Sequence, residues 1–241
     1  MNMKKWIVII VLFNFAYCNQ AFSQQNDAKK SKIIIPPSIG LSGSIGVGFR
    51  SFDTGIVTEK NDKVKISAGG GMWIAVNFIN SVSAKWILGN EVNYHFTSLM
   101  PTLSNAKGSF NNWNYIPSLK RAFFFNNNEM AILVGGGVDI SLEGKFKFNT
   151  TKIPDGALNK YYYEPAIGGS AEVNFLIWNA EGPLGGNIGF RYTYLQYDLD
   201  NASSNGISLS ESDLLGYNLT KDIFEPDGSS IDFFATLLFS F

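Results

Sequence analysis

The chain has 241 residues, of which 45% are hydrophobic, 16% charged and 15% aromatic, and its formal net charge is -1. A soluble globular domain usually has about 25% charged residues, so this charged content is low. The aromatic content excludes a mainly disordered chain, because disordered segments are poor in aromatic residues and rich in charge. The near-neutral charge gives no basic surface for nucleic acid, so we expect no nucleic-acid partner.

The first residues have the pattern of a targeting segment. Residues 1–5 are basic, residues 6–13 (WIVIIVLF) are apolar, and residues 21–23 (AFS) form a small-x-small triplet. This order is typical of a cleaved signal peptide, because the apolar run is too short to span a bilayer. We therefore expect residues 1–23 to be a signal peptide, cleaved after Ser23.

Cleavage would change the composition of the exported chain. It removes two lysines and no acidic residue, which takes the net charge from -1 to -3, and it removes Cys18, the only cysteine. We therefore expect no disulfide. A lipid-modified Cys18 is the alternative, but that modification needs a small residue where Tyr17 stands. Residues 24–38 then form a periplasmic lead-in, and residues 39–241 one domain.

The rest of the sequence alternates between apolar and polar residues with a period of two, as β-strands do. In the last segment, Phe233, Ala235 and Leu237 share one face, while Asp232 and Thr236 share the other. We predict eight strands, at residues 39–51, 64–78, 84–96, 113–125, 130–147, 162–177, 186–198 and 230–241. The gaps between them alternate long and short, with residues 52–63 and 199–229 among the long ones. This rhythm predicts an all-β fold, an eight-stranded antiparallel up-and-down transmembrane β-barrel.

Aromatic residues fall near both ends of the predicted strands. The short-turn end has Phe78, Trp86, Phe123, Phe125, Phe175, Trp178, Phe239 and Phe241, and the long-loop end has Phe49, Phe52, Tyr94, Phe96, Trp113, Tyr115, Phe146, Phe148, Tyr194 and Tyr197. Two aromatic girdles are expected where a barrel meets two membrane interfaces. The alternative is a soluble β-sandwich with aromatic edges, which gives no reason for two belts.

The polar face of the strands would line the barrel interior, which eight strands leave just wide enough for side chains to fill. Glu172 and Arg191 lie at similar distances before and after the third short turn, so neighbouring strands bring them to the same height. We predict an ion pair between them, with Glu91 joining from across the barrel, because a buried charge needs a partner. We interpret these residues as a structural network in the lumen; a gated ion path is the alternative.

Small residues also line the predicted interior, and the facing of one basic pair is open. Glycines recur on the inner face of three strands, and they indicate either tight curvature or a narrow cavity. Residues 69–71 (GGG) lie inside a predicted strand and lack the lysine of a phosphate loop. Lys120 and Arg121 are adjacent, so one faces outward. Arg121 could reach the membrane interface, although a bulge at Pro117 would reverse this assignment.

Signals for catalysis and for cofactors are weak. Residues 95–98 (HFTS) could belong to a barrel-type lipid hydrolase, but the alternation points His95 inward, beside Glu91 and Asn93. No second histidine or mature cysteine is present, so we expect no metal site, no cofactor and no enzyme activity. The acidic last loop could bind Ca²⁺, but its spacing matches no EF-hand, and a solvated loop is the other interpretation.

Three motifs give the chain a family resemblance. Phe239-Ser240-Phe241 is similar to the terminal aromatic signal that the barrel-assembly machinery reads. Residues 115–120 (YIPSLK) resemble a fourth-strand motif, one residue shorter here, and residues 168–175 (GGSAEVNF) resemble a glycine-rich sixth strand with an inward Glu. The chain thus resembles the eight-stranded outer-membrane β-barrel family that includes OmpX and the OmpA membrane domain, and the porin-like β-barrel proteins of Bacteroidota.

The resemblance implies the outer membrane of a Gram-negative bacterium. Its implied partners are outer-membrane lipid, lipopolysaccharide and the barrel-assembly machinery, with a possible surface ligand held by the loops. We expect a non-enzymatic protein with a mostly filled lumen, whose four loops serve envelope structure or surface interaction. A narrow porin-like channel for ions or small solutes is the alternative. An accessory role in protein secretion is a third.

Overall fold

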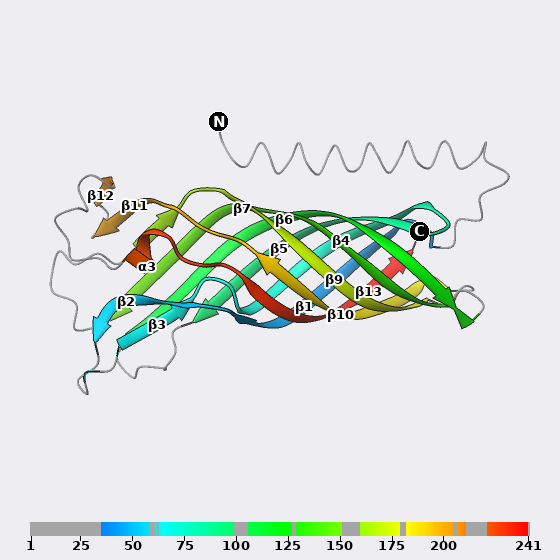
Figure 1. Cartoon of the computed structure of the whole chain (residues 1–241), viewed down its shortest axis with the longest axis horizontal. Helices are drawn as coiled ribbons and strands as arrows, with labels where there is room; N and C mark the ends of the chain where they lie inside the picture. The colour runs from blue at the N-terminus through cyan, green and yellow to red at the C-terminus, as the bar shows by residue number, and fades with distance from the viewer. Residues whose placement is uncertain are drawn as a thin grey trace.

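The computed structural model describes residues 35–57, 61, 63–98, 106–126, 129–150, 160–178, 182–204, 207–210 and 221–240. Within them, eight strands close into an antiparallel barrel (Figure 1). These strands are β1 (Ser38–Gly48), β4 (Gly71–Ser83), β5 (Trp86–Ser98), β6 (Ala106–Phe125), β7 (Met130–Thr150), β9 (Ala166–Trp178), β10 (Leu184–Tyr194) and β13 (Ser230–Ser240). Because β1 pairs with both β4 and β13, and β7 pairs with β9, the eight barrel strands leave no free edge. The predicted all-β class and eight-stranded barrel are confirmed.

Shorter elements extend the barrel at one end. They are β2 (Ser51–Val57), β3 (Lys63–Ser67), β8 (Lys160–Tyr163), β11 (Leu199–Ser204), β12 (Ile207–Ser210) and the helix α3 (Lys221–Phe224). Figure 1 shows β2, β3, β11, β12 and α3 together at this end, which we call the loop side. The opposite end, where β4–β5, β6–β7 and β9–β10 are joined by short connections, is the turn side. The predicted loops 52–63 and 199–229 therefore contain regular structure.

Three of the predicted strands are interrupted on the loop side. The first ends at Gly48 before β2 begins, and the second splits into β3 and β4 at a bend over residues 68–70. Gly71 follows this bend with φ of +117°, a conformation that favours glycine. The sixth splits between β8 and β9 at Pro165, which has no N–H for the ladder. The prediction that residues 69–71 lie inside a strand is therefore wrong for Gly69 and Gly70, while Gly71 begins β4.

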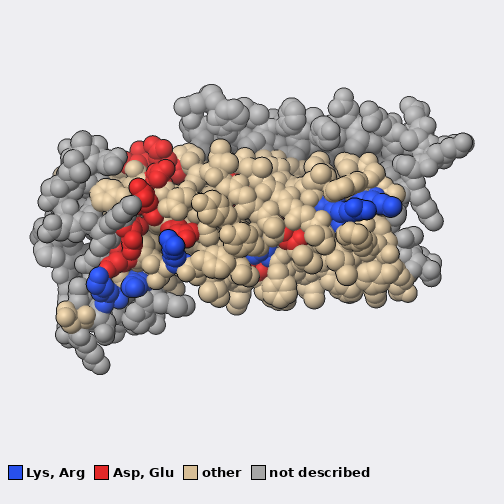
Figure 2. Space-filling model, in the orientation of Figure 1, with Lys and Arg blue, Asp and Glu red and all other residues tan. Residues whose placement is uncertain are grey.

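The outward faces of the barrel strands form a continuous apolar belt. Leu41, Ile45, Ile74, Ile188 and Leu237 are each half exposed or more. Figure 2 shows the middle of one face mostly free of charged side chains, which gather toward the two ends. Soluble monomers rarely expose so large an apolar surface, and a lipid bilayer is the environment that covers such a belt. The closed sheet also excludes the alternative of a two-sheet sandwich.

Aromatic residues lie at both ends of the belt, but not all of them point outward. Trp86 and Phe123 on the turn side, and Phe96, Trp113 and Tyr194 on the loop side, are exposed on the outer face, as girdle residues are. Others assigned to the girdles are buried inside the barrel: Phe52, Phe146, Phe148, Trp178 and Tyr197. For these residues the girdle prediction is wrong, because they help to close the two ends of the interior.

Several expectations fall on residues that the structure does not describe. The signal peptide at residues 1–23, residues 24–34 of the lead-in, and Phe241 of the terminal motif lie outside the described ranges. Phe239 is described and is exposed on the outer face of β13. Among the described residues, no helix is both long and apolar enough to cross a bilayer.

A charge placed on the belt tests its contact with lipid. Ile188 is 50% exposed near the middle of β10, and we expect Ile188→Lys to lower the free energy of unfolding by about 2–4 kcal/mol. Ile207, 68% exposed on β12 beyond the belt, is the matched control. We expect Ile207→Lys to change the free energy of unfolding by less than about 0.5 kcal/mol. Urea unfolding in phospholipid vesicles measures both. Equal effects would contradict a lipid-covered belt.

Candidate functional site

A row of charged residues crosses the inner face of the barrel. The strand register places Lys120 beside Gly135, and Gly135 beside Glu172. Glu172 is beside Arg191, and Arg191 is beside Asp232. The charges therefore alternate in sign along neighbouring strands, and strand alternation turns each of them into the interior.

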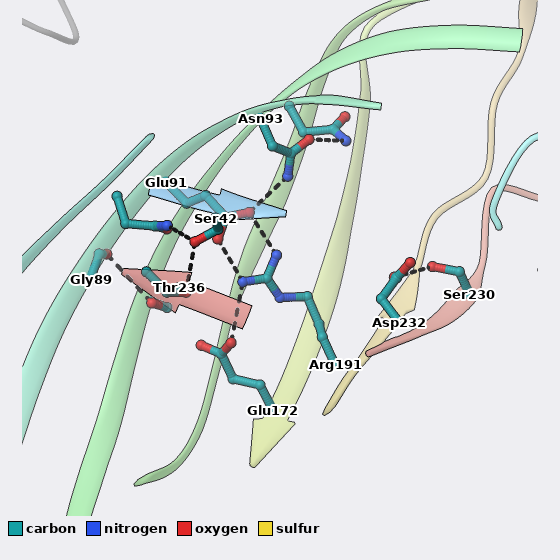
Figure 3. Close-up of polar contacts among 12 residues, drawn as sticks. Ser42, Gly89, Glu91, Asn93, Glu172, Arg191, Ser230, Asp232 and Thr236 are labelled. Carbon is teal, nitrogen blue, oxygen red and sulfur yellow. Dashed lines mark hydrogen bonds and ion pairs between the residues drawn. The ribbon is translucent and has the colours of Figure 1, made fainter. Parts of the chain in front are cut away.

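Arg191 is the centre of this network and is only 4% exposed. Its two terminal nitrogens donate to the two carboxylate oxygens of Glu91, each at 2.7 Å. Nη2 also donates to Oε2 of Glu172 at 3.2 Å, and Figure 3 shows both carboxylates around the guanidinium. Glu91 is on β5, diametrically opposite β10. The structure thus brings together the three residues that the sequence singled out, in the fork geometry that makes Arg–carboxylate pairs strong.

Lys120 is the member of the network that the sequence left undecided. Its Nζ lies 2.5 Å from Oε1 of Glu172, while Arg121 faces outward, 5.3 Å from the ring centroid of Phe123. The irregularity of β6 is at Trp113/Asn114 and not at Pro117. Because the alternation from Pro117 onward is unbroken, simple parity would have identified Lys120 as inward.

Two aromatic rings pack against Arg191. Its guanidinium carbon is 5.1 Å from the ring centroid of Trp73 and 5.2 Å from that of Phe234, in the range of cation–π contacts. Trp73 is a large side chain on the inner face of β4, and its contact with the buried cation accounts for its place there.

A chain of asparagine side chains continues the network toward the loop side. Asn93 donates to Glu91 at 2.8 Å, and Asn114 donates to Asn93 at 3.0 Å. Asn112 donates to Asn114 at 2.7 Å, and its Oδ1 lies 2.8 Å from Nδ1 of His95. These bonds satisfy polar groups that are buried away from bulk solvent. His95 is inward, as the alternation predicted.

Apolar residues close the interior on the turn side. The turn-side cluster comprises Ile35, Ile79, Ile87, Ala122, Ala131, Leu133, Leu176, Trp178 and Leu238. Ile35 is 1% exposed and precedes β1, so part of the predicted lead-in packs inside the barrel. The turn-side end of the lumen is therefore filled.

A larger apolar cluster closes the loop side. This loop-side cluster comprises Phe52, Val64, Ile66, Ala68, Phe110, Phe146, Phe148, Tyr161, Tyr163, Ala166, Leu195, Tyr197, Leu199, Ala202 and Ile223. The β2–β3 hairpin supplies its first three members and α3 supplies Ile223. Between the two clusters lies a polar compartment built around Arg191. The sequence pattern missed this closure because it assigned the hairpin and α3 mostly to loops.

Two small cavities remain inside the compartment, with volumes of about 30 and 10 Å³. Both are lined by Arg191, and the larger is also lined by His95, Asp139 and Asp232. A water molecule needs roughly 10–15 Å³ of such space, so the larger cavity suits about two waters and the smaller at most one. Waters there would bond to the Oδ1 atoms of Asp139 and Asp232, which are buried without a protein partner.

The inward glycines mark close approach between backbones. A Cβ on Gly135 would collide with the carbonyl oxygen of Leu119, and one on Gly189 would meet the backbone oxygen of Val173 at 2.7 Å. A Cβ on Gly46 would collide with the carboxylate of Asp232. Of the two explanations offered by the sequence, these contacts favour tight packing and curvature over a glycine-lined passage.

Comparisons with known proteins show the fold. No protein-family model matches the sequence, and no curated protein matches it. The outer membrane protein OprG from Pseudomonas aeruginosa superposes with a TM-score of 0.53 at 11% identity, covering 86% of this chain and 96% of that chain. The outer membrane protein AlkL, solved in lipid bilayers, superposes with a TM-score of 0.46 at 14% identity, covering 89% of this chain and 95% of that chain. The translocator domain of the autotransporter NalP from Neisseria meningitidis superposes with a TM-score of 0.38 at 10% identity, covering 95% of this chain and 98% of that chain.

The likeness to OprG establishes the fold and no more, because the identity is low. The OmpX and OmpA resemblance and the relation to Bacteroidota proteins stay predictions. The chain therefore has the closed barrel fold that OprG shares, with an interior filled by an ionic network between two apolar clusters.

Removal of the central cation tests the network. We expect Arg191→Met to lower the free energy of unfolding by about 3–5 kcal/mol, because it leaves Glu91 buried without its partner. Adding Glu91→Gln should recover about 1 kcal/mol or more, since Lys120 still neutralises Glu172. Urea unfolding of both variants in lipid vesicles gives the difference. A double variant less stable than the single one would show that the pairing is not what stabilises this site.

Proposed function

We propose that this protein is a non-enzymatic outer-membrane protein of a Gram-negative bacterium, whose filled barrel holds surface loops for envelope structure or surface interaction. The sealed interior carries the proposal. An ionic network centred on Arg191 fills the middle of the lumen, and apolar clusters fill both ends. A barrel filled in this way leaves its outer ends, and not its lumen, to make contact with partners.

The topology supports the orientation that this role needs. Ser38 of β1 pairs with Ser240 of β13, so both ends of the barrel lie on the turn side. Outer-membrane barrels place short turns toward the periplasm and long loops outside. The loop side, with its hairpin, short strands and helix, would then face the cell exterior and the sugar layer of lipopolysaccharide.

A concavity on the loop side is the candidate contact surface. Its volume is about 810 Å³, within the range of small-ligand sites, and its lining includes Leu142, Tyr162, Glu164, Pro165 and Asp200. Three strand irregularities meet there. Leu142 is an extra residue opposite β6, Pro165 separates β8 from β9, and Asp200 is an extra residue opposite β8. Such irregularities re-aim side chains, and here they turn several toward one surface.

A narrow channel is the second candidate. The observation in its favour is that both interior cavities are lined by Arg191, so displacement of this side chain would join them. Ions would still have to pass the two apolar clusters, which is why we rank the channel second.

Electrical recording separates the two candidates. In a planar lipid bilayer, we expect the folded wild-type protein and its Glu172→Gln variant to give no single-channel current, because the lumen is filled. Faster migration of unboiled than of boiled protein on a gel confirms folding. Discrete wild-type openings that change in Glu172→Gln would instead establish a channel gated by the network.

Labelling of intact cells tests the location and the orientation. Ser208 is exposed on β12 at the loop side, and Asn126 is exposed beside a short turn. We expect a membrane-impermeant maleimide to label Ser208→Cys on whole cells, and to label Asn126→Cys only after the outer membrane is opened. Labelling of Asn126→Cys alone on whole cells would show that the barrel has the opposite orientation. If neither variant were labelled in broken cells, neither residue would be accessible on the surface.

A further inference from the structure

His95, the only histidine of the chain, is bound between two hydrogen-bond acceptors. It is 6% exposed; its Nδ1 lies 2.8 Å from Oδ1 of Asn112, and its Nε2 lies 2.7 Å from the carbonyl oxygen of Gly70. A neutral imidazole donates from one nitrogen and presents a lone pair at the other. Only a ring protonated on both nitrogens can donate to two acceptors.

The orientation of the Asn112 amide follows from the chain of bonds that begins at Glu91. An ionised carboxylate only accepts, so Asn93 must turn its NH₂ group toward Glu91. That leaves Oδ1 of Asn93 to accept from Asn114, and Oδ1 of Asn114 to accept from Asn112. The NH₂ group of Asn112 is thereby committed, and only its oxygen faces His95.

We propose that the closed barrel holds His95 as an imidazolium ion, which donates to Asn112 and to Gly70 and thereby locks the bend between β3 and β4. The lock is a proton-dependent closure of the loop side. It goes beyond the proposed surface role, since it concerns what keeps the interior shut.

The charges around the ring favour the proton. The larger cavity, which His95 lines, also has Asp139 from β7, Arg191 from β10, Tyr197 from the segment after β10 and Asp232 from β13. Burial opposes a charge on the ring, and nearby carboxylates favour it. Among the described residues, the eight barrel strands bury two cationic side chains, Lys120 and Arg191, and four carboxyl groups; these are Glu91, Asp139, Glu172 and Asp232. Each of these carboxyl groups that is ionised offsets part of the cost of burying the imidazolium.

Loss of the proton would act on the hairpin that closes the loop side. Gly70 lies in the bend that joins the β2–β3 hairpin to β4, and Ala68 of the same bend is buried in the loop-side cluster. A neutral ring would leave one buried acceptor facing a lone pair, which shifts the equilibrium of the bend toward its released form by about tenfold. Because the locked bend binds the proton more tightly than a released bend does, the lock weakens as pH rises.

The single histidine makes the test direct. The full chain, labelled with ¹⁵N-histidine and folded in detergent micelles, is followed by NMR from pH 5 to pH 9. We expect both ring nitrogens to be protonated at pH 5. As the proton leaves, amide protection factors in Lys63–Ser67 should fall by about tenfold while those of β13 hold. An unprotonated ring nitrogen at pH 5 in the folded barrel would overturn the proposal, as would loss of the proton with hairpin protection unchanged.

Two variants separate the lock from general packing. Asn112→Leu removes one acceptor, and we expect a ring that is protonated only on Nε2 and a hairpin whose protection no longer follows that proton. Asn90→Leu, on the neighbouring strand β5, is the matched control. Its asparagine bonds to the Tyr115 hydroxyl and not to this chain, so the ring should titrate as in the wild type. Two protonated nitrogens in Asn112→Leu throughout the same pH range would contradict the role of Asn112.

Discussion

A backbone amide in the hydrocarbon of a bilayer finds no water to bond with, so a strand can cross only if both of its edges are paired. The pairing of β1 with both β4 and β13 meets this condition and leaves no edge in the apolar belt. Closure has a second effect, because every other side chain now points into a space sealed from lipid. The polarity of the inner face, which would be costly elsewhere, therefore becomes possible.

The filled interior follows from the width of that space. Eight strands leave room for side chains and little else, so charges placed there must neutralise one another. Arg191 meets two carboxylates and two aromatic rings, and Lys120 shares Glu172 with it. The asparagine chain extends the same hydrogen-bonding to His95. Because the apolar clusters at both ends separate this compartment from bulk solvent, its charged groups depend on partners inside the barrel.

The sequence was most informative where alternation is unbroken. It placed Glu172 beside Arg191 because the two residues lie at similar distances before and after one short turn, on strands that pair with each other. It was least informative on the loop side, where alternation changes phase. The break at residues 68–70 moves Ile66 into the loop-side cluster while Ile74 stays on the outer face. An extra residue at Leu142 likewise changes the phase of β7, so that Glu143 no longer shares a face with Ser141.

Parity could also have identified more of the candidate site than it did. Lys120 was left open because Pro117 suggested a bulge, yet the displaced residue lies elsewhere on the same pair of strands. No periodicity could have shown that the β2–β3 hairpin closes the loop side, because that contact joins segments through their tertiary packing. The partners of His95 were equally inaccessible, since one of them is the backbone of a bend.

The seam between β1 and β13 has a consequence for how long the native state survives. Its pairs run from Ser38 and Ser240 to Gly48 and Ser230, joining the two ends of the described barrel over its full height. Such distant partners can meet only after the strands between them have assembled, so the seam is expected to close last. Once it is shut, any attempt to unzip it would expose Arg191 and its carboxylates to hydrocarbon. The barrel should then persist through a high barrier to opening, with a lifetime longer than its equilibrium stability alone implies.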